Sequence, residues 1–587
     1  MSHRKISRRE MLRMSAAAAA GLLISACQPK TEPVVDEDLP VAEKATALPA
    51  PTDVPANTNI LGKVYPADAL PAEEQVLTTF GGTPWAMDRF VSMYQGTDFA
   101  GALSLVRFND EYDVLPCAAE SWEISDDGLK WTFHLVKGVM WTDGQPLTAD
   151  DFVASFQYGA SPDHAWDFAW YYNNIKNWKE ATAGEVGVED IGVRTIDDYT
   201  LEFETVSPAP FLPGQLLWSA VMNKAALEKH GEFYNNDPAT SVSCSPYKLV
   251  KYEKDVEAVF EMNEKYTGPA ELVPYYTKIR SYIPPAIDNL TAYQSSEATQ
   301  IGLEADLARV AEEDSELSKQ LYWTYGDFRC FFISFNFEAP FDDPRVRMAI
   351  AKSFQRDILV PAAAGNAGVA TYTFLGSGFP GSHADTAEGK AIQSYDPDAA
   401  RQLLVDAGYP NGEGIPKLEI PVRPGVAALS ILAQGIAEEL GTQLGIEAEV
   451  VNWETKIFID ETRAQRSVPM YMDGYGMDYL DQSNMLGIFA SDALINWNDA
   501  QYDDLFNEAA PFLGDATERD KLFWDAEKRL LEEAAIIPLY TIRLPSLVKP
   551  NVAGAGMEPD KAGNAGPHWP SSYPLGEFSL TTYLTKG

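Results

Sequence analysis

Apolar and polar residues alternate along two short stretches of the segment 115–156. In residues 122–124, and again in residues 131–135, every second side chain is apolar. Such alternation is typical of a strand with one buried face. Asp127-Gly128 lies between the two stretches, and this pair supplies the positive φ of a two-residue hairpin turn. The pattern therefore predicts an antiparallel hairpin that is closed by a tight turn.

A helix is predicted at the end of the same segment. Thr148 and Asp151 have the spacing of a capping box, in which each side chain accepts a hydrogen bond from the backbone N–H of the other residue. Phe152, Val153 and Phe156 follow at positions that place them on one helical face. We therefore expect an amphipathic helix that begins after Thr148.

The rest of the chain mixes the strand and helix periods and shows no short internal repeat. Clusters of turn-forming residues separate the periodic segments. The predicted elements are a first strand at 73–80, hairpins at 193–204 and 245–263, helices at 224–230, 287–307, 312–321 and 394–412, a strand–turn–helix unit at 333–360, a helix–turn–strand unit at 428–451 and a strand at 534–547. This alternation predicts a mixed α/β (α+β) fold.

The composition limits the kind of protein. A chain of 587 residues gives a prior of about three to four domain-sized units, and 45% hydrophobic residues suffice for large cores. The formal net charge of −41 argues against a nucleic-acid partner, because phosphate binding needs clustered Lys and Arg. An acidic coat favours solubility and carries little information about the charge of a ligand.

The N-terminus has the pattern of an export signal. A basic stretch precedes a short apolar run at 16–24, which falls short of the ~20 apolar residues of a membrane-spanning helix. The residues that end at Cys27 resemble a lipobox, so residues 1–27 are predicted to be a lipoprotein signal peptide with Cys27 as the lipidation site. Arg8-Arg9 resembles a twin-arginine export motif, and the general secretory route is the alternative.

The segment after the predicted signal peptide differs in composition from the body of the chain. Residues 28–75 are rich in Pro, Ala, Glu, Asp and Thr and show no sustained period. Such composition buries too little apolar surface to form a core. We therefore predict a disordered tether between the lipid and the folded body.

Three cysteines remain once Cys27 is lipidated, namely Cys117, Cys244 and Cys330. An odd number argues against a disulfide framework, and their spacing, with six scattered His residues, fits no zinc motif. We expect buried thiols with at most one disulfide, and neither a metal site nor a cofactor.

Two blocks of sequence resemble a known family. The first is AESWEISDDGLKWTFHLVKGVMWTDGQPLTADDFVAS at 119–155. The second block contains Asn336, Pro340, Phe341, Asp343, Arg345, Val346, Arg347, Ala349, Arg356 and Asp357. Both closely resemble the family 5 extracellular solute-binding proteins, which are the oligopeptide, dipeptide and nickel receptors of ABC importers. The resemblance runs from about residue 73 to about residue 552, and insertions around 166–182 and 374–383 favour the oligopeptide-binding branch.

The resemblance implies a two-lobed, periplasmic-binding-protein-like fold of type II with an extra domain. Its domains are discontinuous, because the chain crosses between them. Domain I is expected to comprise residues 76–104, 218–325 and 546–587. Domain II is expected at 105–217 and domain III at 326–545.

The resemblance also implies a ligand site. Asp478 stands where the family's cleft motif has the Asp that binds the α-ammonium of a peptide, and Tyr475 stands where that motif usually has Trp. Asp481 and Asn484 are candidate ligand-binding residues for which support of a turn and hinge is the favoured role. A turn-capping carboxylate is the alternative for Asp478.

Three positions depart from the family pattern or carry a weaker signal. Met472 occupies the place of a ligand-contacting Arg in some oligopeptide receptors, so the partner of a peptide carboxylate stays open. Cys244 replaces a polar Asn in a segment expected to line the cleft. Trp497 is a candidate pocket wall, although core packing is the ordinary role of a Trp.

The function that the resemblance implies is capture of peptides and their delivery to the permease of an ABC importer. The ATPase must lie in a separate subunit, because the chain has no G-x-x-x-x-G-K-[ST] motif. We expect a monomer that lipidated Cys27 anchors to the outer side of the cytoplasmic membrane, in the periplasm or at the cell surface.

Other functions stay open at this point. A receptor of the same fold can take a non-peptide solute, such as an oligosaccharide or a metal chelate. An envelope scaffold without a ligand is a further alternative. An envelope hydrolase is disfavoured, because neither a G-x-S-x-G elbow nor an H-E-x-x-H motif occurs.

Overall fold

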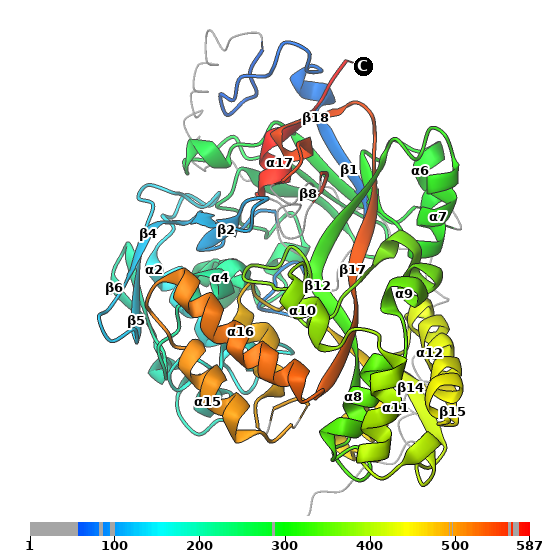
Figure 1. The fold of residues 1–587 in the computed structure, drawn as a ribbon. Helices are drawn as coiled ribbons and strands as arrows, with labels where there is room; N and C mark the ends of the chain where they lie inside the picture. Colours follow the sequence, from blue (N-terminus) through cyan, green and yellow to red (C-terminus); the bar gives the residue numbers. More distant parts are fainter. Residues whose placement is uncertain are drawn as a thin grey trace, which may run out of the picture. The chain divides into compact units, whose positions relative to one another are not determined.

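An eleven-stranded mixed sheet extends through the body of the protein (Figure 1). The structure is a computed structural model, and its described residues belong to one compact unit that spans Val54–Gly587. The described ranges are 57–81, 86–93, 100–284, 288–491, 493–495, 497–560, 565–567 and 575–586. The predicted signal peptide with Cys27, and the predicted tether up to residue 56, lie outside the described residues.

The strand order in this sheet is β15-β14-β16-β12-β17-β11-β1-β10-β9-β8, and β13 pairs with β17. β1 is parallel to β10 and β14 to β15, whereas β12 is antiparallel to both β16 and β17. The strands are β1 Val76–Phe80, β8 Tyr247–Glu253, β9 Glu257–Met262, β10 Lys278–Tyr282, β11 Gln300–Gly302, β12 Leu321–Phe335, β13 Gly368–Ala370, β14 Leu418–Val422, β15 Ala448–Asn452, β16 Met470–Tyr475 and β17 Ile536–Val548.

Two long strands connect the two halves of this sheet. β12 has 15 residues and β17 has 13, and they are paired along most of their length. The predicted boundaries of domain III, at 326 and 545, fall inside these two strands. The sheet is therefore continuous across both boundaries.

The pairing of β12 with β17 shifts in register at two places, between Tyr325 and Cys330 and between Phe331 and Phe332, and the first is the longer. It is regular up to Tyr325 and resumes at Cys330, so residues 326–329 are out of register. Phe328 has a φ of 47°, which is a left-handed backbone conformation that a non-glycine residue rarely adopts. Such irregularities bend a strand and turn its side chains in new directions. Here the irregularity lies next to the end of β16, because Cys330 pairs with Tyr475.

A separate four-stranded antiparallel sheet contains the first sequence block. Its order is β4-β5-β7-β6, with bounds β4 Ala119–Ile124, β5 Lys130–Leu135, β6 Val193–Asp197 and β7 Thr200–Glu204. The alternating apolar residues of β5 are buried, as the sequence predicted. Helix α2, Ala149–Gly159, begins with the predicted capping box of Thr148 and Asp151, and its Phe152 and Phe156 side chains are buried in the core of this sheet.

The turn between β4 and β5 differs from the prediction. Residues 125–129 connect the strands, and Gly128 alone among them has a positive φ. The Ser125 hydroxyl and the Asp127 carboxylate organise this longer loop through a hydrogen bond of 2.6 Å. The prediction of a two-residue turn was wrong because side-chain hydrogen bonds satisfy the loop without a second left-handed residue.

The helices surround the two sheets. The remaining helices are α3 Trp178–Thr182, α4 Leu212–Gln215, α5 Lys224–His230, α6 Asn289–Ser295, α7 Ala305–Glu313, α8 Pro344–Lys352, α9 Arg356–Ala364, α10 Ala387–Ile392, α11 Pro397–Asp406, α12 Ala427–Glu439, α13 Thr455–Ile459, α14 Gln482–Leu486, α15 Ala500–Ala509, α16 Ala516–Glu532 and α17 Glu577–Thr581. Two short strand pairs complete the fold, β2 Val106–Phe108 with β3 Val114–Pro116, and β18 Val552–Gly554 with β19 Thr582–Leu584.

The predicted helices at 287–307 and 312–321 were wrong in part. Strand β11 separates α6 from α7, and the chain after α7 leads through turns into β12. β11 lies between β1 and β17 and pairs with both. Strand pairing with distant segments overrides the local helical spacing there, as tertiary contacts often do for short segments.

The predicted tether extended too far toward the body. Residues 57–75 are described and packed: buried Asn59 donates a hydrogen bond from Nδ2 to the Pro274 carbonyl at 2.8 Å. Lys63 Nζ donates to the carbonyls of Val273 and Leu580, at 2.7 Å each. These partners lie more than 200 residues away in sequence, so composition alone gave no sign of them. The prediction of disorder is wrong for residues 57–75.

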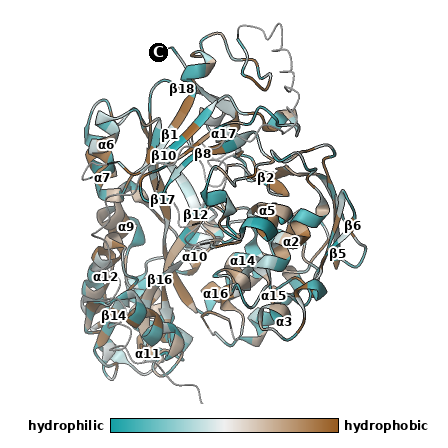
Figure 2. Ribbon diagram, turned by 180° about the vertical axis from the view of Figure 1, so that it is seen from behind, coloured by the Kyte–Doolittle hydropathy of each residue, from teal (hydrophilic) through white to brown (hydrophobic). Residues whose placement is uncertain are grey.

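Hydrophobic residues occupy the interior strands. Figure 2 shows hydrophobic colour along β16 and hydrophilic colour on outer helices such as α11. β16 is buried on both faces, between helices and the neighbouring strands. Within the described ranges, no helix has both the length and the apolar character to cross a membrane. The same ranges hold no group of three or more His, Cys, Asp or Glu side chains that is arranged to bind a metal ion.

Candidate functional site

The chain turns sharply after β16, and this turn positions Asp478. A Cβ at Gly476 would overlap the carboxylate of Asp327, so a larger residue there would displace that side chain from the irregular part of β12. The backbone N–H of Met477 donates to the Asp327 carbonyl at 2.8 Å. These contacts hold the residues immediately before Asp478 against β12.

Neutral groups hold the Asp478 carboxylate. Tyr475 Oη donates to Asp478 Oδ2 at 2.6 Å, and Asn484 Nδ2 donates to the same oxygen at 3.3 Å. Asn484 Oδ1 also accepts the Asp478 backbone N–H at 2.9 Å. Within the described residues, both hydrogen bonds to the carboxylate end on Oδ2, so Oδ1 is available to a further donor.

No described basic side chain forms an ion pair with Asp478. Arg329 is the basic residue that lowers the pKa of Asp478 from a distance, but its guanidinium is paired with Asp327 at 2.6 Å. Burial is the largest influence, and it raises the pKa of the Asp478 carboxyl above its ordinary value. The site is thus a partly desolvated carboxylate whose charge lacks a counter-ion.

Residues of the region around the first sequence block reach the backbone of Asp478. Trp218 Nε1 donates to the Asp478 carbonyl at 3.0 Å, and Tyr171 Oη lies 3.4 Å from the same oxygen. The rings of Phe211 and Tyr479 stack with centroids 5.0 Å apart. A cavity of about 330 Å³ lies beside these contacts, and Asn484 is among its lining residues.

A second carboxylate on β16 has a different environment. Asp473 is 1% exposed and accepts hydrogen bonds from two arginines: Arg423 Nη1 reaches Oδ1 at 3.1 Å, and Arg463 Nε reaches Oδ2 at 3.1 Å. Arg423 Nη1 also donates to the Gly474 carbonyl at 2.6 Å. Met472, where the family resemblance had suggested an Arg, is fully buried in a hydrophobic cluster. The cationic groups in this area therefore come from other elements than β16.

Asp481 supports the local fold. Its side chain caps α14 by accepting the Ser483 N–H at 2.9 Å. Both carboxylate oxygens also accept hydrogen bonds from Arg519, at 2.7 and 2.8 Å. The carboxylate is thereby fully engaged within the protein. Any contact of Asp481 with a ligand stays a prediction.

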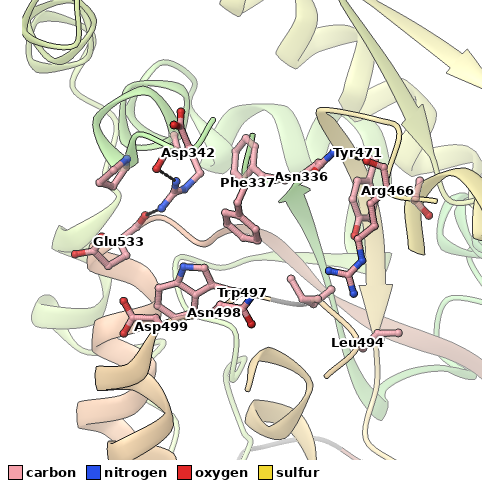
Figure 3. Close-up of a pocket in the computed structure, with 15 residues that line it drawn as sticks. Asn336, Phe337, Asp342, Arg466, Tyr471, Leu494, Trp497, Asn498, Asp499 and Glu533 are labelled. Atoms are coloured by element: carbon pink, nitrogen blue, oxygen red, sulfur yellow. Dashed lines mark hydrogen bonds between the residues drawn. The ribbon is translucent and has the colours of Figure 1, made fainter. Parts of the chain in front are cut away.

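The structure does not bring all predicted site residues together. Tyr475, Asp478 and Asn484 form one cluster. Cys244 is buried in the hydrophobic core around α2, and burial raises the pKa of its thiol. Trp497 lines another cavity, of about 490 Å³ (Figure 3). Ligand contacts of Cys244 and Trp497 therefore stay predictions, and Trp497 lines a different cavity from Asn484.

All three cysteines in the described ranges are buried free thiols, in agreement with the expectation from their number.

Sequence reasoning missed the residues that approach Asp478 from far along the chain. Trp218 and Tyr171 lie 260 and 307 residues before it. Asp327 and Arg329 lie between the elements predicted at 312–321 and 333–360, and the break in register around them leaves no periodic signal. A single sequence offered no means of pairing these segments.

Comparison with known proteins identifies the family. The sequence model of the bacterial extracellular solute-binding proteins, family 5, matches residues 113–497. The periplasmic oligopeptide-binding protein OppA of Salmonella typhimurium strain LT2 is 29% identical over 462 residues, which cover 76% of this chain and 82% of that protein. The probable deoxycholate-binding periplasmic protein YgiS of Escherichia coli K12 is 30% identical over 473 residues, covering 77% and 84%.

Solved structures show the same fold. The unliganded open form of the periplasmic murein tripeptide-binding protein MppA superposes with a TM-score of 0.73 at 21% identity, covering 89% of this chain and 99% of that one. Haemophilus influenzae OppA in complex with RPPGFSPFR gives a TM-score of 0.61 at 23% identity, covering 88% and 99%. The fold is thus that of the two-lobed binding proteins, as expected. The chain belongs to family 5 of the bacterial extracellular solute-binding proteins.

Proposed function

We propose that this protein captures peptides and delivers them to the permease of an ABC importer. Family 5 proteins are the substrate-binding components of such importers and are not enzymes. The observation that carries the peptide proposal is the state of Asp478, a partly buried carboxylate with one available oxygen and no ion pair in the described residues. A peptide α-ammonium supplies the missing charge.

The proposed contact follows from simple electrostatics. A buried carboxylate is costly unless a cation reaches it, and a charge-assisted hydrogen bond is roughly twice as strong as a neutral one. Tyr475 and Asn484 fix the orientation of the carboxylate, so a ligand loses little free energy in ordering it. Water removal on closure of the cleft strengthens the same interaction.

The opposite end of a peptide needs donors for its carboxylate. Arg423 and Arg463 share Asp473, and Arg329 donates to the Gly474 carbonyl at 3.3 Å. Each of these three guanidinium groups is partly exposed. We propose that they meet the peptide carboxylate in place of the arginine that is absent at residue 472.

Calorimetry with a mixture of di- to pentapeptides tests the Asp478 contact. We expect Asp478→Asn to weaken binding about 10- to 100-fold, because a hydrogen bond to a charged group is worth about 1.5–3 kcal/mol. N-terminal acetylation of the same peptides should weaken binding to the parent protein by a similar factor and add little to the loss in the variant. Asp398→Asn, at an exposed carboxylate of α11, is the matched control. Equal affinity for free and acetylated peptides would refute the proposal.

The location belongs to the same proposal. Lipidation of Cys27 would anchor the protein to the outer side of the cytoplasmic membrane, residues 28–56 would act as the tether, and Arg8-Arg9 would direct twin-arginine export. We further propose that it acts as a monomer beside a permease with a separate ATPase.

Cys27→Ser should release the protein from membrane fractions, and Arg8→Lys with Arg9→Lys should retain it inside the cell. A membrane-bound Cys27→Ser protein contradicts the anchor.

A non-peptide solute is the second candidate ligand. The 30% identical relative named as a probable deoxycholate-binding protein, and the buried Met472 at the expected Arg position, both support it. Deoxycholate, an oligosaccharide and chelated nickel should be titrated beside the peptides. Thermal stabilisation by one of them, with none by any peptide, would favour this alternative.

A further inference from the structure

The cavity that Trp497 lines has charged groups of opposite sign at its two sides. It has a volume of about 490 Å³, which is within the ~300–1,000 Å³ range of small-molecule sites. Figure 3 shows Asp342, Asp499 and Glu533 at one side and Arg466 at the other, with the rings of Phe337 and Trp497 between them. The cavity is thus polar at its ends and aromatic in its middle.

The acidic side has more negative charge than its neighbours neutralise. Arg529 binds both Asp499, at 2.7 Å, and Glu533, at 2.5 Å, so one cation serves two carboxylates. Asp342 is exposed and forms no ion pair with a described residue. The buried Arg347 directs its guanidinium to backbone carbonyls, including those of Asp342 and Glu533, at 3.1 and 2.7 Å. A ligand cation placed here would meet excess negative charge.

The opposite side offers a cation without a carboxylate partner. Arg466 Nε lies 3.4 Å from the Arg463 carbonyl, and its two Nη groups donate to no described residue. Asn336 binds the backbone carbonyl of Arg466 through its amide nitrogen, which positions the residue. The guanidinium is therefore available to an anionic group in the cavity.

The wall between the two sides includes a hydrogen-bond donor, the indole N–H of Trp497. Trp497 is 5% exposed, and its indole N–H is not among the buried polar atoms of the described residues that lack a partner, so it keeps access to solvent in the cavity. An indole N–H that lines a cavity can donate a hydrogen bond to a polar group of a ligand there. A ligand oxygen in the cavity would accept this hydrogen bond, and the adjacent aromatic faces would attract a cationic nitrogen.

We propose that this cavity is a second ligand site, which takes a small zwitterion with its carboxylate at Arg466 and its ammonium at the Asp342 side. The site is separate from the Asp478 cluster. It lies at the other end of β16, beside Tyr471, and shares no charged residue with that cluster. Leu494 lines both this cavity and the one beside Asn484. A free amino acid and a short peptide both have the required chemistry.

A titration with 6-aminohexanoate tests the proposal, and saturation-transfer NMR measures the binding. The titration is done in the Asp478→Asn variant, so that the first site does not compete for the ammonium. We expect 6-aminohexanoate to bind at least about 10-fold more tightly than hexanoate or hexylamine, each of which retains one charged end. L-Lysine and triglycine serve as the free amino acid and the peptide, and binding of either supports the site.

Two substitutions locate the binding. Arg466→Gln should weaken 6-aminohexanoate binding about 10-fold, and Trp497→Phe, which keeps a ring and removes the N–H, should weaken it about 3- to 10-fold. Arg401→Gln, at an exposed arginine of α11, should leave it unchanged. Thermal melting of each variant checks that it is folded. The proposal is overturned if either single-charge analogue binds as tightly as the zwitterion, or if both variants retain full affinity.

Discussion

Two aspartates at the end of β16 lie five residues apart and have opposite surroundings. Asp473 is buried between Arg423 and Arg463, and each of its oxygens accepts a hydrogen bond from a cation. Asp478 accepts its hydrogen bonds from a phenol and an amide, and both reach the same oxygen. The charge of Asp473 is balanced within the protein, whereas the charge of Asp478 is not.

The difference separates a structural carboxylate from a binding carboxylate. A buried carboxylate with two guanidinium partners fixes the elements that carry those partners, here the segments after β14 and α13. A carboxylate with only neutral partners is held in place but retains its attraction for an external cation. The sequence motif identifies Asp478 as a candidate binding residue, but it does not show that Asp473 is paired with two arginines from other elements.

The largest expected effect is on stability at Asp473. Asp473→Asn should lower the free energy of unfolding by about 1.5–3 kcal/mol, because it weakens the charge-assisted hydrogen bonds from two partly exposed guanidinium groups to a buried carboxylate. Urea unfolding followed by circular dichroism measures this effect. Asp478→Asn should change the free energy of unfolding by less than about 1 kcal/mol, since it breaks no ion pair. If Asp473→Asn and Asp478→Asn lower the free energy of unfolding equally, the distinction between the two aspartates is wrong.

The next effect is on the pH dependence of peptide binding. Burial raises the pKa of Asp478, so in the free protein its protonated form is favoured by folding. The stability that this proton contributes is present at low pH and is lost as pH rises through the raised pKa. Binding of an ammonium needs the charged form, so affinity should fall up to about tenfold per pH unit below that pKa. Calorimetry across the acid range measures this fall, and Asp478→Asn should show a flat profile.

A smaller effect is expected at Tyr475. Tyr475→Phe removes the phenol that donates to Asp478 Oδ2 and leaves the ring. Peptide affinity should fall about 3- to 10-fold, because a neutral hydrogen bond is worth about 0.5–1.5 kcal/mol. The pKa of Asp478 should also rise further, since this hydrogen bond lowers it. An unchanged pH profile would show that Tyr475 does not orient the carboxylate.

The smallest effect concerns the carboxylate end of a peptide. Arg423→Gln should weaken binding of a peptide with a free C-terminus about 3-fold, because a partly exposed ion pair is worth about 1 kcal/mol or less. The same peptide with a C-terminal amide should bind the parent and the variant equally. Competition binding with the matched peptides measures both. If Arg423→Gln weakens the binding of the free-acid peptide and of the amidated peptide equally, Arg423 supports the fold and does not contact the peptide carboxylate.

Local patterns predicted much of the fold. The hairpin at 193–204, the helix at 224–230 and the cap at Thr148 depend on neighbouring residues, and the structure confirms them. The strand β11 and the packed segment 57–75 depend on partners that are hundreds of residues away, and both were missed. Short-range spacing determines local geometry, but it carries little information about which distant segment will supply a hydrogen bond.

The candidate site shows the same limit. The motif around Asp478 was visible in the sequence, together with Tyr475 and Asn484, and the structure places these three side chains in contact. The absence of a cation beside Asp478 was not visible, because it depends on Asp327 neutralising Arg329 first. That Trp497 and Asn484 line different cavities likewise depends on the path of the chain after α14.

The break in register of β12 has a mechanical consequence. A regular pair of strands as long as β12 and β17 resists bending, because every hydrogen bond along it must deform together. Residues 326–329 carry no such bonds to β17, so bending strain concentrates there. Asp327 and Arg329 are in this compliant stretch and also face the turn that holds Asp478. A ligand that touches them would contact the sheet where β12 and β17 are out of register, so it would act on the part of the strand pair that regular pairing restrains least.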